Sequence, residues 1–211
     1  ADYREDDPSE LLEGPKIGFK LPEVLTVEEI DTIISTVDMS KKEGQRNRAI
    51  LETLYSCGLR VSELCNLKLS DLYFEEGFIK VEGKGSKQRL VPISPRAIKE
   101  IKYWLTDRNL GKIKKGYEDY VFLARWGNNI SRIMVFHMIK ELAEKTGITK
   151  NITFHSYRRT FATLQAAAGT DIRTIQSIMA HKSITTTQRY MKVVDSNKRK
   201  ASNKISLIRK S

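Results

Sequence analysis

Cysteine, histidine and long apolar runs are all scarce in this sequence. Its 211 residues include two cysteines and three histidines. Cys57 and Cys65 lack the spacing of a metal site, so we expect both to be reduced and structural. No run of about 18 apolar residues is present, which excludes a membrane span. The first ten residues have neither the basic nor the apolar part of a signal peptide, so we expect a cytoplasmic protein.

Positive charge is in excess but unevenly distributed. The net charge is +11, yet the first 40 residues carry 11 acidic and only 3 basic side chains. Lysine and arginine therefore dominate the remainder of the chain, and a basic body of this kind attracts a polyanion. A charged surface that only maintains solubility is the alternative.

Proline and glycine are concentrated at the start of the chain. Pro8, Gly14, Pro15, Gly18 and Pro22 lie among scattered acids. This composition is typical of an extended linker, so we expect residues 1–23 to be the remnant of an interdomain linker, with a further segment before it in the complete protein.

Helical patterns dominate from Leu25 onward. Thr26 and Glu29 form a predicted capping box before the apolar Ile30, Ile33 and Ile34. Periodic apolar residues predict further helices over 44–56, 59–64, from Ser94, over 131–146, 156–169, 171–179 and 183–190. The predicted core residues are Ile133, Phe136, Ile139 and Leu142 in helix 131–146, and Ile172, Ile175, Ile178 and Met179 in helix 171–179.

Residues 72–93 change to the period of strands. The runs 72–74, 78–81 and 89–93 predict a three-stranded antiparallel meander, so the predicted fold is mainly α with a small antiparallel sheet. Lys84 and Lys87 lie in the second turn, Gly83–Lys87. That turn is consistent with a solvated hairpin tip or with a phosphate-binding loop.

The stretch Phe154–Tyr190 has the residues for phosphodiester chemistry. His155 and Arg158 are three apart and share a helix face; His181 and Tyr190 follow. A phenol ionises near pH 10, so attack on an anionic phosphodiester needs fixed cations, for which arginine is best suited. It also needs a proton donor for the leaving oxygen and in-line geometry. A helix-turn-helix DNA reader around Gly169–Asp171 is the alternative, and the lone His137 is expected to be structural.

Five ordered motifs resemble the tyrosine recombinases, in particular the Xer and phage-integrase branch. The resemblance as a whole covers about residues 24–195, which we therefore expect to form the catalytic domain. The motifs are Gly58–Leu64, Gly83–Arg89, His155-x-x-Arg158, Ala180–Ser183 and Tyr190.

The resemblance implies a role for each matching residue. Arg60 and Arg158 would clamp the scissile phosphate, Lys84 would protonate the leaving 5′ oxygen, and Tyr190 would form a 3′-phosphotyrosyl bond. His155 and His181 would bind the phosphate and assist proton transfer, with Glu63 supporting the site. The covalent bond would preserve the energy of the cut strand, so no ATP, metal or other cofactor is expected. Further DNA-binding candidates are Lys87, Arg89, Arg159 and Arg173.

The sequence departs from the family pattern at two positions and in extent. Arg159 replaces a common histidine and Ala180 replaces a common glycine, but neither change removes a catalytic group. This sequence does not include the family's N-terminal DNA-clamping domain, which we expect to precede the predicted linker in the complete protein. The basic tail 196–211 contains Ile205, Leu207 and Ile208, so we expect it to dock, in cis or on another protomer.

Three functions follow from the resemblance. The first is a site-specific recombinase that acts on double-stranded DNA as a tetramer of protomers. The second is a DNA-binding protein of the same fold without cleavage. The third is relaxation of DNA in the manner of a type IB topoisomerase. The intact motifs favour the first over the second, and the tail favours the first over the third.

Overall fold

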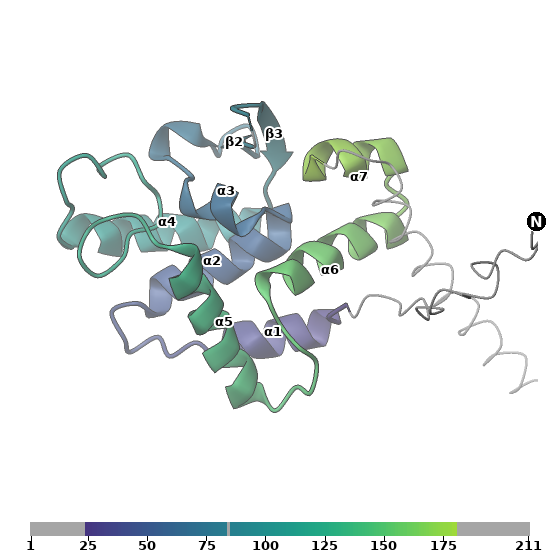
Figure 1. Ribbon diagram of the computed structural model, residues 1–211, viewed down its shortest axis with the longest axis horizontal. Helices are drawn as coiled ribbons and strands as arrows, with labels where there is room; N and C mark the ends of the chain where they lie inside the picture. Colours follow the sequence, from purple (N-terminus) through teal and green to yellow (C-terminus); the bar gives the residue numbers. More distant parts are fainter. Residues whose placement is uncertain (1–23, 84, 181–211) are drawn as a thin grey trace, which may run out of the picture.

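The structure is a mainly helical fold around one central helix (Figure 1). It is a computed structural model that describes residues 24–83 and 85–180. The predicted linker 1–23, Lys84, His181, helix 183–190 with Tyr190, and the tail 196–211 lie outside the described residues. The elements are α1 Val27–Ser35, α2 Gly44–Cys57, α3 Val61–Cys65, a 3₁₀ turn Leu69–Asp71, β1 Leu72–Tyr73, β2 Phe78–Glu82, β3 Gln88–Pro92, α4 Pro95–Leu110, α5 Arg132–Thr146, α6 Phe154–Ala167 and α7 Ile172–Met179.

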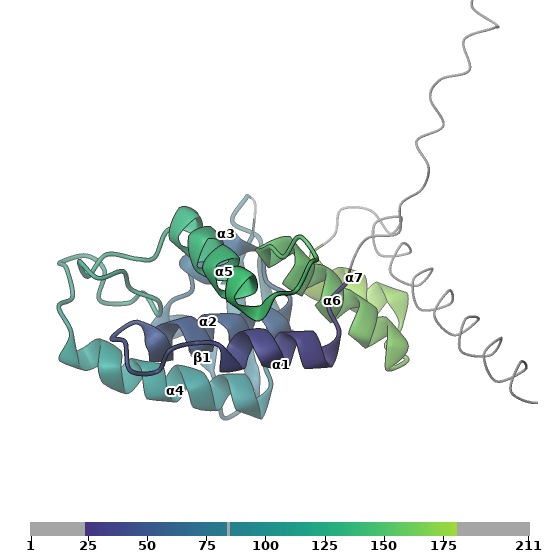
Figure 2. The same cartoon turned by 90° about the horizontal axis from the view of Figure 1, so that it is seen from below.

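Helix α2 forms the centre of the core. Ile50, Leu51 and Leu54 are fully buried, and α2 packs against α1, α3, α4 and α6. Figure 2 shows α1 and α4 running alongside α2. The helix ends at Gly58, which has a left-handed φ of 58°. A side chain here would place its Cβ 2.4 Å from the Phe161 ring, so conformation and space both require glycine.

The beginning of the described chain is anchored to α6. The predicted capping box is present, with the Thr26 hydroxyl and the Glu29 carboxylate each accepting the other residue's backbone N–H. Just before it, the Leu25 N–H donates to Thr160 Oγ1 at 2.9 Å. Lys150 forms an ion pair of 2.7 Å with Glu29. These contacts attach the start of α1 to α6 and to the loop between α5 and α6.

The predicted three-stranded antiparallel sheet is confirmed. Its order is β1-β2-β3, with Ile79 opposite Val91 and Val81 opposite Arg89. Strand β1 ends at Tyr73, so Phe74, which was expected in the strand, belongs to the turn. Ile79, Val81 and Val91 point into the core, which places the β2–β3 hairpin against α2 and α7.

The predicted apolar face of α5 is partly wrong. Ile133 is 68% exposed and Phe136 is 36% exposed. The core face consists instead of Val135, Met138, Ile139 and Leu142, which follow the same i, i+3, i+4, i+7 spacing. Two apolar stripes of similar period occur on this helix, and tertiary packing selects between them.

Helices α6 and α7 pack together and share a small apolar core. Helix α6 packs against α2, and Phe161 contributes to a small second core with Ile175 and Met179. Ile172 and Ile178, which were expected in the α7 core face, are only half-buried. A helix-turn-helix reads DNA with its second helix, here the partly exposed α7, so the burial of α6 does not test that alternative.

Both cysteines are free and buried, in agreement with their predicted structural role. Burial raises the pKa of the Cys65 thiol to about 11 and that of Cys57 to about 12, so neither is a reactive thiolate at neutral pH. In the part of the chain that the structure describes, no helix is long and apolar enough to cross a bilayer.

Candidate active site

Arg60 lies at the turn between α2 and α3. It is the N-cap residue of α3, and its backbone N–H donates to Glu63 Oε2 at 2.8 Å. Its guanidinium donates through Nη1 to Glu63 Oε1 at 2.8 Å and through Nη2 to the Ala180 carbonyl at 2.7 Å. The side chain remains 39% exposed, so Arg60 is oriented by the protein and still accessible to a ligand.

Glu63 is the buried centre of the site, with a side chain that is 2% exposed. Arg89 donates to it bidentately, with Nη1 and Nη2 at 2.8 and 3.0 Å from the two carboxylate oxygens. Burial acts to raise the pKa of Glu63, but hydrogen bonds from Arg89 and the Arg60 backbone outweigh burial and hold the pKa below its ordinary value. Glu63 is therefore an ionised anchor for two arginines.

Arg158 approaches the same place from α6. Its side chain is buried and donates to the carbonyl oxygens of Gly58 and Met179. The Gly58 carbonyl belongs to the turn that positions Arg60, so this contact fixes the start of α3 relative to α6. The structure thus brings Arg60, Glu63 and Arg158 together, as the sequence motifs predicted.

The end of α7 receives three arginines in succession. The carbonyls of Ile178, Met179 and Ala180 accept hydrogen bonds from Arg89, Arg158 and Arg60, respectively. Carbonyls at a helix C-terminus lack intrahelical donors and carry partial negative charge, so cations are favoured there. Ala180, with φ 47°, immediately precedes His181 in the sequence.

His155 is exposed at the first turn of α6, three residues before Arg158. Its ring lies 4.4 Å from that of Phe154. Partial burial, followed by the charges of Arg159 and Arg158, lowers the pKa of His155 below its ordinary value. The imidazole is therefore neutral at neutral pH and able to accept a proton.

Tyr157 lies within the His155–Arg158 motif, and its position argues against a nucleophilic role. It is fully buried, and its hydroxyl has no hydrogen-bond partner among the described residues. Burial, with a smaller effect of Glu52, raises the pKa of the phenol above its ordinary value. A buried and protonated phenol cannot reach a DNA phosphate.

The four DNA-binding candidates have different environments. Lys87, near the tip of the β2–β3 hairpin, and Arg173 on α7 are exposed. Arg159 is half-buried and makes a hydrogen bond of 3.4 Å to Ser156 Oγ. Arg89 points inward with a side chain only 13% exposed, and all its nitrogens donate to Glu63 or Ile178, which favours a supporting role over DNA contact.

The inward position of Arg89 is the feature that sequence reasoning missed. The alternation of β3 places residue 89 on the same side as the buried Val91. An arginine at such a position requires an internal acidic or carbonyl partner. That alternation is the signal by which its role could have been found.

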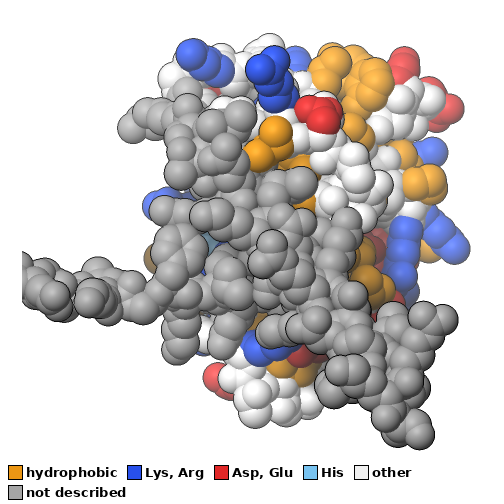
Figure 3. Space-filling view, turned by 90° about the vertical axis from the view of Figure 1, so that its right-hand side faces the viewer, with side chains coloured by type: hydrophobic (Ala, Val, Ile, Leu, Met, Phe, Trp, Pro, Cys, Tyr) orange, Lys and Arg blue, Asp and Glu red, His pale blue; other side chains and the backbone are white. Residues whose placement is uncertain are grey.

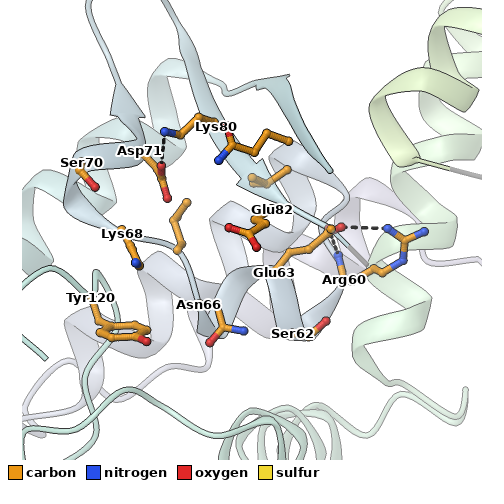
Figure 4. A pocket seen from close by; sticks show the side chains of 14 residues that line it. Arg60, Ser62, Glu63, Asn66, Lys68, Ser70, Asp71, Lys80, Glu82 and Tyr120 are labelled. Carbon is orange, nitrogen blue, oxygen red and sulfur yellow. Dashed lines mark hydrogen bonds and ion pairs between the residues drawn. The ribbon is translucent and has the colours of Figure 1, made fainter. Parts of the chain in front are cut away.

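A polar cavity of about 560 Å³ opens beside Arg60, between α3 and strand β2. Figure 4 shows Arg60 and Glu63 at one end of it and the Asp71–Lys80 ion pair, 3.0 Å, at the other. Lys68 lies over the Tyr120 ring at 5.9 Å. The lining contains both charge signs. Within residues 24–83 and 85–180, no three His, Cys, Asp or Glu side chains are grouped as a metal site requires.

The sequence of the chain is similar to curated recombinases. It matches the model of the phage integrase family over residues 23–197. It is 39% identical over 201 residues to tyrosine recombinase XerD of Staphylococcus saprophyticus, covering 95% of this chain and 68% of that protein. XerD of Staphylococcus aureus (strain Mu50) is 38% identical over the same length.

Solved structures give the same result. The crystal structure of XerA recombinase superposes with a TM-score of 0.76 at 33% identity, covering 87% of this chain and 65% of that one. XerH recombinase in a post-cleavage complex with palindromic difH substrate gives a TM-score of 0.77 at 26% identity, covering 90% of this chain and 55% of that one. This chain therefore spans about two thirds of XerA and about half of XerH. It belongs to the phage integrase family of tyrosine recombinases, a family of site-specific recombinases, as its motifs and its mainly helical fold predicted.

Proposed function

We propose that this domain cuts and rejoins double-stranded DNA through a covalent 3′-phosphotyrosyl intermediate. The observation that carries the proposal is the convergence of Arg60 and Arg158, from separate elements, on neighbouring carbonyls at the end of α7. Arg60 is 39% exposed and can neutralise an anionic phosphodiester directly. Arg158 is buried beside it, so in this proposal its guanidinium exchanges the carbonyls of Gly58 and Met179 for phosphate oxygens when DNA binds.

The proposed reaction assigns one step to each group. The Tyr190 phenolic oxygen attacks phosphorus, the bond to the 5′ oxygen breaks, and Lys84 gives that oxygen its proton. His155 and His181 bind the phosphate, and one of the two imidazoles accepts the phenolic proton. Rejoining is the reverse reaction, in which a 5′ hydroxyl displaces the tyrosine, so no ATP or metal is used.

The proposal also includes the domain bounds, the partner protomers and the cellular compartment. The domain would comprise residues 24–195, with the tail 196–211 docking in cis or on another protomer of a synaptic tetramer. Because the substrate is DNA, we place the protein in the cytoplasm.

Figure 3 shows Lys and Arg side chains at several separate places on the face beside α6 and α7. The motif residues locate the proposed DNA contact.

Incubation with a nicked suicide duplex tests the proposal. We expect the chain to form a denaturant-resistant protein–DNA adduct in excess EDTA. Tyr190→Phe is expected to bind the duplex and form no adduct, because its ring lacks the attacking oxygen. Tyr157→Phe is the matched control, since that hydroxyl is buried, and it should form adduct. Adduct from Tyr190→Phe, or loss of adduct on chelation with recovery in Mg²⁺, would contradict the assignment.

The two hairpin lysines test the proposed general acid. Loss of a general acid typically slows cleavage by about 10²–10⁴-fold. Lys84→Ala should show such a loss on an ordinary phosphodiester and recover on a 5′-bridging phosphorothiolate, whose thiolate leaving group needs little protonation. Lys87→Ala should weaken DNA binding modestly and reduce its salt dependence. Equal behaviour of both variants on both substrates would remove Lys84 from the catalytic set.

Adduct formation also separates the alternative functions. A DNA-binding protein of this fold without cleavage would bind the duplex and give no adduct. A type IB topoisomerase-like enzyme would form the adduct and relax supercoiled plasmid without exchanging strands between two duplexes. Exchange between two labelled duplexes is the result that favours a recombinase.

A further inference from the structure

Arg89 occupies a position on β3 that joins three parts of the site. Nη1 and Nη2 bind the two oxygens of Glu63 at 2.8 and 3.0 Å, while Nε donates to the Ile178 carbonyl at 2.6 Å. The guanidinium therefore spans from the β2–β3 hairpin to α3 and to α7. Every nitrogen has a protein partner, so none is needed for DNA.

Glu63 transmits this position to Arg60. The same two carboxylate oxygens that accept from Arg89 also accept from the backbone N–H and the Nη1 of Arg60, each at 2.8 Å. A carboxylate fixed by a bidentate fork has little freedom to rotate. The direction in which Arg60 points therefore depends on where Arg89 holds Glu63.

The end of α7 depends on the same arginine. Arg89 holds the first of the three successive carbonyls, at Ile178, and Arg60 holds the third, at Ala180. These contacts fix the backbone that leads directly into His181 in the sequence. A shift of Arg89 would move both the arginine that faces the ligand and the chain that carries the next catalytic motif.

We infer that Arg89 is a positioning residue for the recombinase reaction: it sets Glu63, and through Glu63 it orients Arg60 and the end of α7 without touching DNA. This inference rests on the proposed function. Lysine cannot replace the fork, because a single ammonium cannot bind both carboxylate oxygens in the same plane and also reach the Ile178 carbonyl.

The test compares Arg89→Lys with a matched pair elsewhere in the fold. Arg96 on α4 also faces a buried glutamate, with Nε 2.6 Å from Oε1 of Glu52. We expect Arg89→Lys to slow single-turnover cleavage of the suicide duplex by about 10–100-fold, as small displacements of catalytic groups do, with the Kd for DNA nearly unchanged. Arg96→Lys should cleave at the wild-type rate.

A second substrate separates positioning from a general loss of structure. A methylphosphonate at the scissile position carries no negative charge, so it demands less of a correctly placed Arg60. The defect of Arg89→Lys should therefore shrink on this substrate relative to the wild type. Equal slowing on both substrates would overturn the inference and indicate a structural role only.

Each remaining outcome has a definite meaning. If the wild type forms no adduct, the proposed function fails together with the inference. If the wild type forms adduct and Arg89→Lys cleaves equally fast, the inference alone fails. If Arg89→Lys loses both DNA affinity and salt dependence of binding, Arg89 is a DNA contact and the inference is overturned. If Arg89→Lys does not fold, as judged by its melting transition, Glu63→Asp replaces it, because this change draws the same carboxylate back by one methylene. We then expect Glu63→Asp to slow cleavage with a nearly unchanged Kd for DNA, and to show a smaller defect on the methylphosphonate.

Discussion

Glu63 and Glu52, two buried glutamates that each face an arginine, differ in electrostatic state. The side chains of Glu63 and Glu52 are each 2% exposed. Glu63 accepts four hydrogen bonds from Arg60 and Arg89, and its pKa is lowered. Glu52 forms an ion pair with Arg96, but its Oε1 has no partner in hydrogen-bond geometry. Burial then prevails, and the pKa of Glu52 is raised.

The difference shows that burial alone does not decide whether a carboxylate is an anchor. Desolvation opposes the charge at both sites, and aligned donors reverse the outcome only at Glu63. The backbone N–H of Arg60 is one of these donors, and it depends on the turn at Gly58 that begins α3. The Glu63 carboxylate is therefore ionised because the local fold supplies fixed donors around it.

Neutralising each carboxylate should give the largest difference between the two sites. Glu63→Gln leaves the buried Arg89 without its charge partner, so we expect a loss of about 3 kcal/mol in the free energy of unfolding. We also expect cleavage to fall by about 10²-fold as Arg60 loses its orientation. Glu52→Gln should cost less than about 1 kcal/mol, because Arg96 is largely exposed and water replaces the carboxylate. Urea unfolding and single-turnover cleavage measure both; equal losses would contradict the comparison.

The pH dependence of stability should separate the two groups in sign. Lowering of the folded-state pKa of Glu63 stabilises the fold above its ordinary value of 4.5, and this contribution disappears as pH falls through the lowered pKa. Raising of the folded-state pKa of Glu52 has the opposite effect, with stability lost as pH rises from 4.5 through the raised pKa.

Unfolding free energies measured between about pH 3 and pH 7 test these signs. The stability advantage of the wild type over Glu63→Gln should shrink on acidification below 4.5. Relative to the wild type, Glu52→Gln should improve as pH rises above 4.5. The same sign of change for both variants would show that the two carboxylates have equivalent environments.

The smallest expected effect concerns Ala180, whose carbonyl Arg60 holds. Its φ of 47° is strained for a residue with a Cβ atom. Ala180→Gly should raise the free energy of unfolding by about 0.5–1 kcal/mol and the melting temperature by about 1–4 °C, after the entropy of the more flexible unfolded chain is included. Ser86→Gly, at φ 54° in the exposed hairpin, is the matched control. A gain at Ser86 alone would show that the arginine contacts, rather than strain, determine the end of α7.

Short-range sequence patterns predicted most of the fold. The capping box at Thr26 and the three-stranded meander follow from short-range rules, and the structure has both in the predicted part of the chain. The apolar face of α5 could not be chosen in this way, because Ile133 and Val135 belong to stripes of equal period and only packing distinguishes them.

The candidate site was predictable as a set of residues but not as a network. The spacing of His155 and Arg158 indicated shared chemistry, and the family resemblance added Arg60. The structure brings the two arginines to the same end of α7. That Arg89 would bind Glu63 could not be predicted from spacing, because it depends on the register of β3 relative to α3. Long-range register of this kind appears only when the tertiary fold is known.

Gly58 limits how this domain can evolve. Its α-carbon faces the Phe161 ring and its carbonyl receives Arg158, so it is fixed from both sides by α6. One residue inserted into α2 would rotate the end of that helix by about 100° and carry Gly58 away from both contacts. Length variation among functional descendants should therefore be rare between residues 44 and 60. It should be common in the exposed loop around residues 111–116, which is distant in the fold from the arginine network.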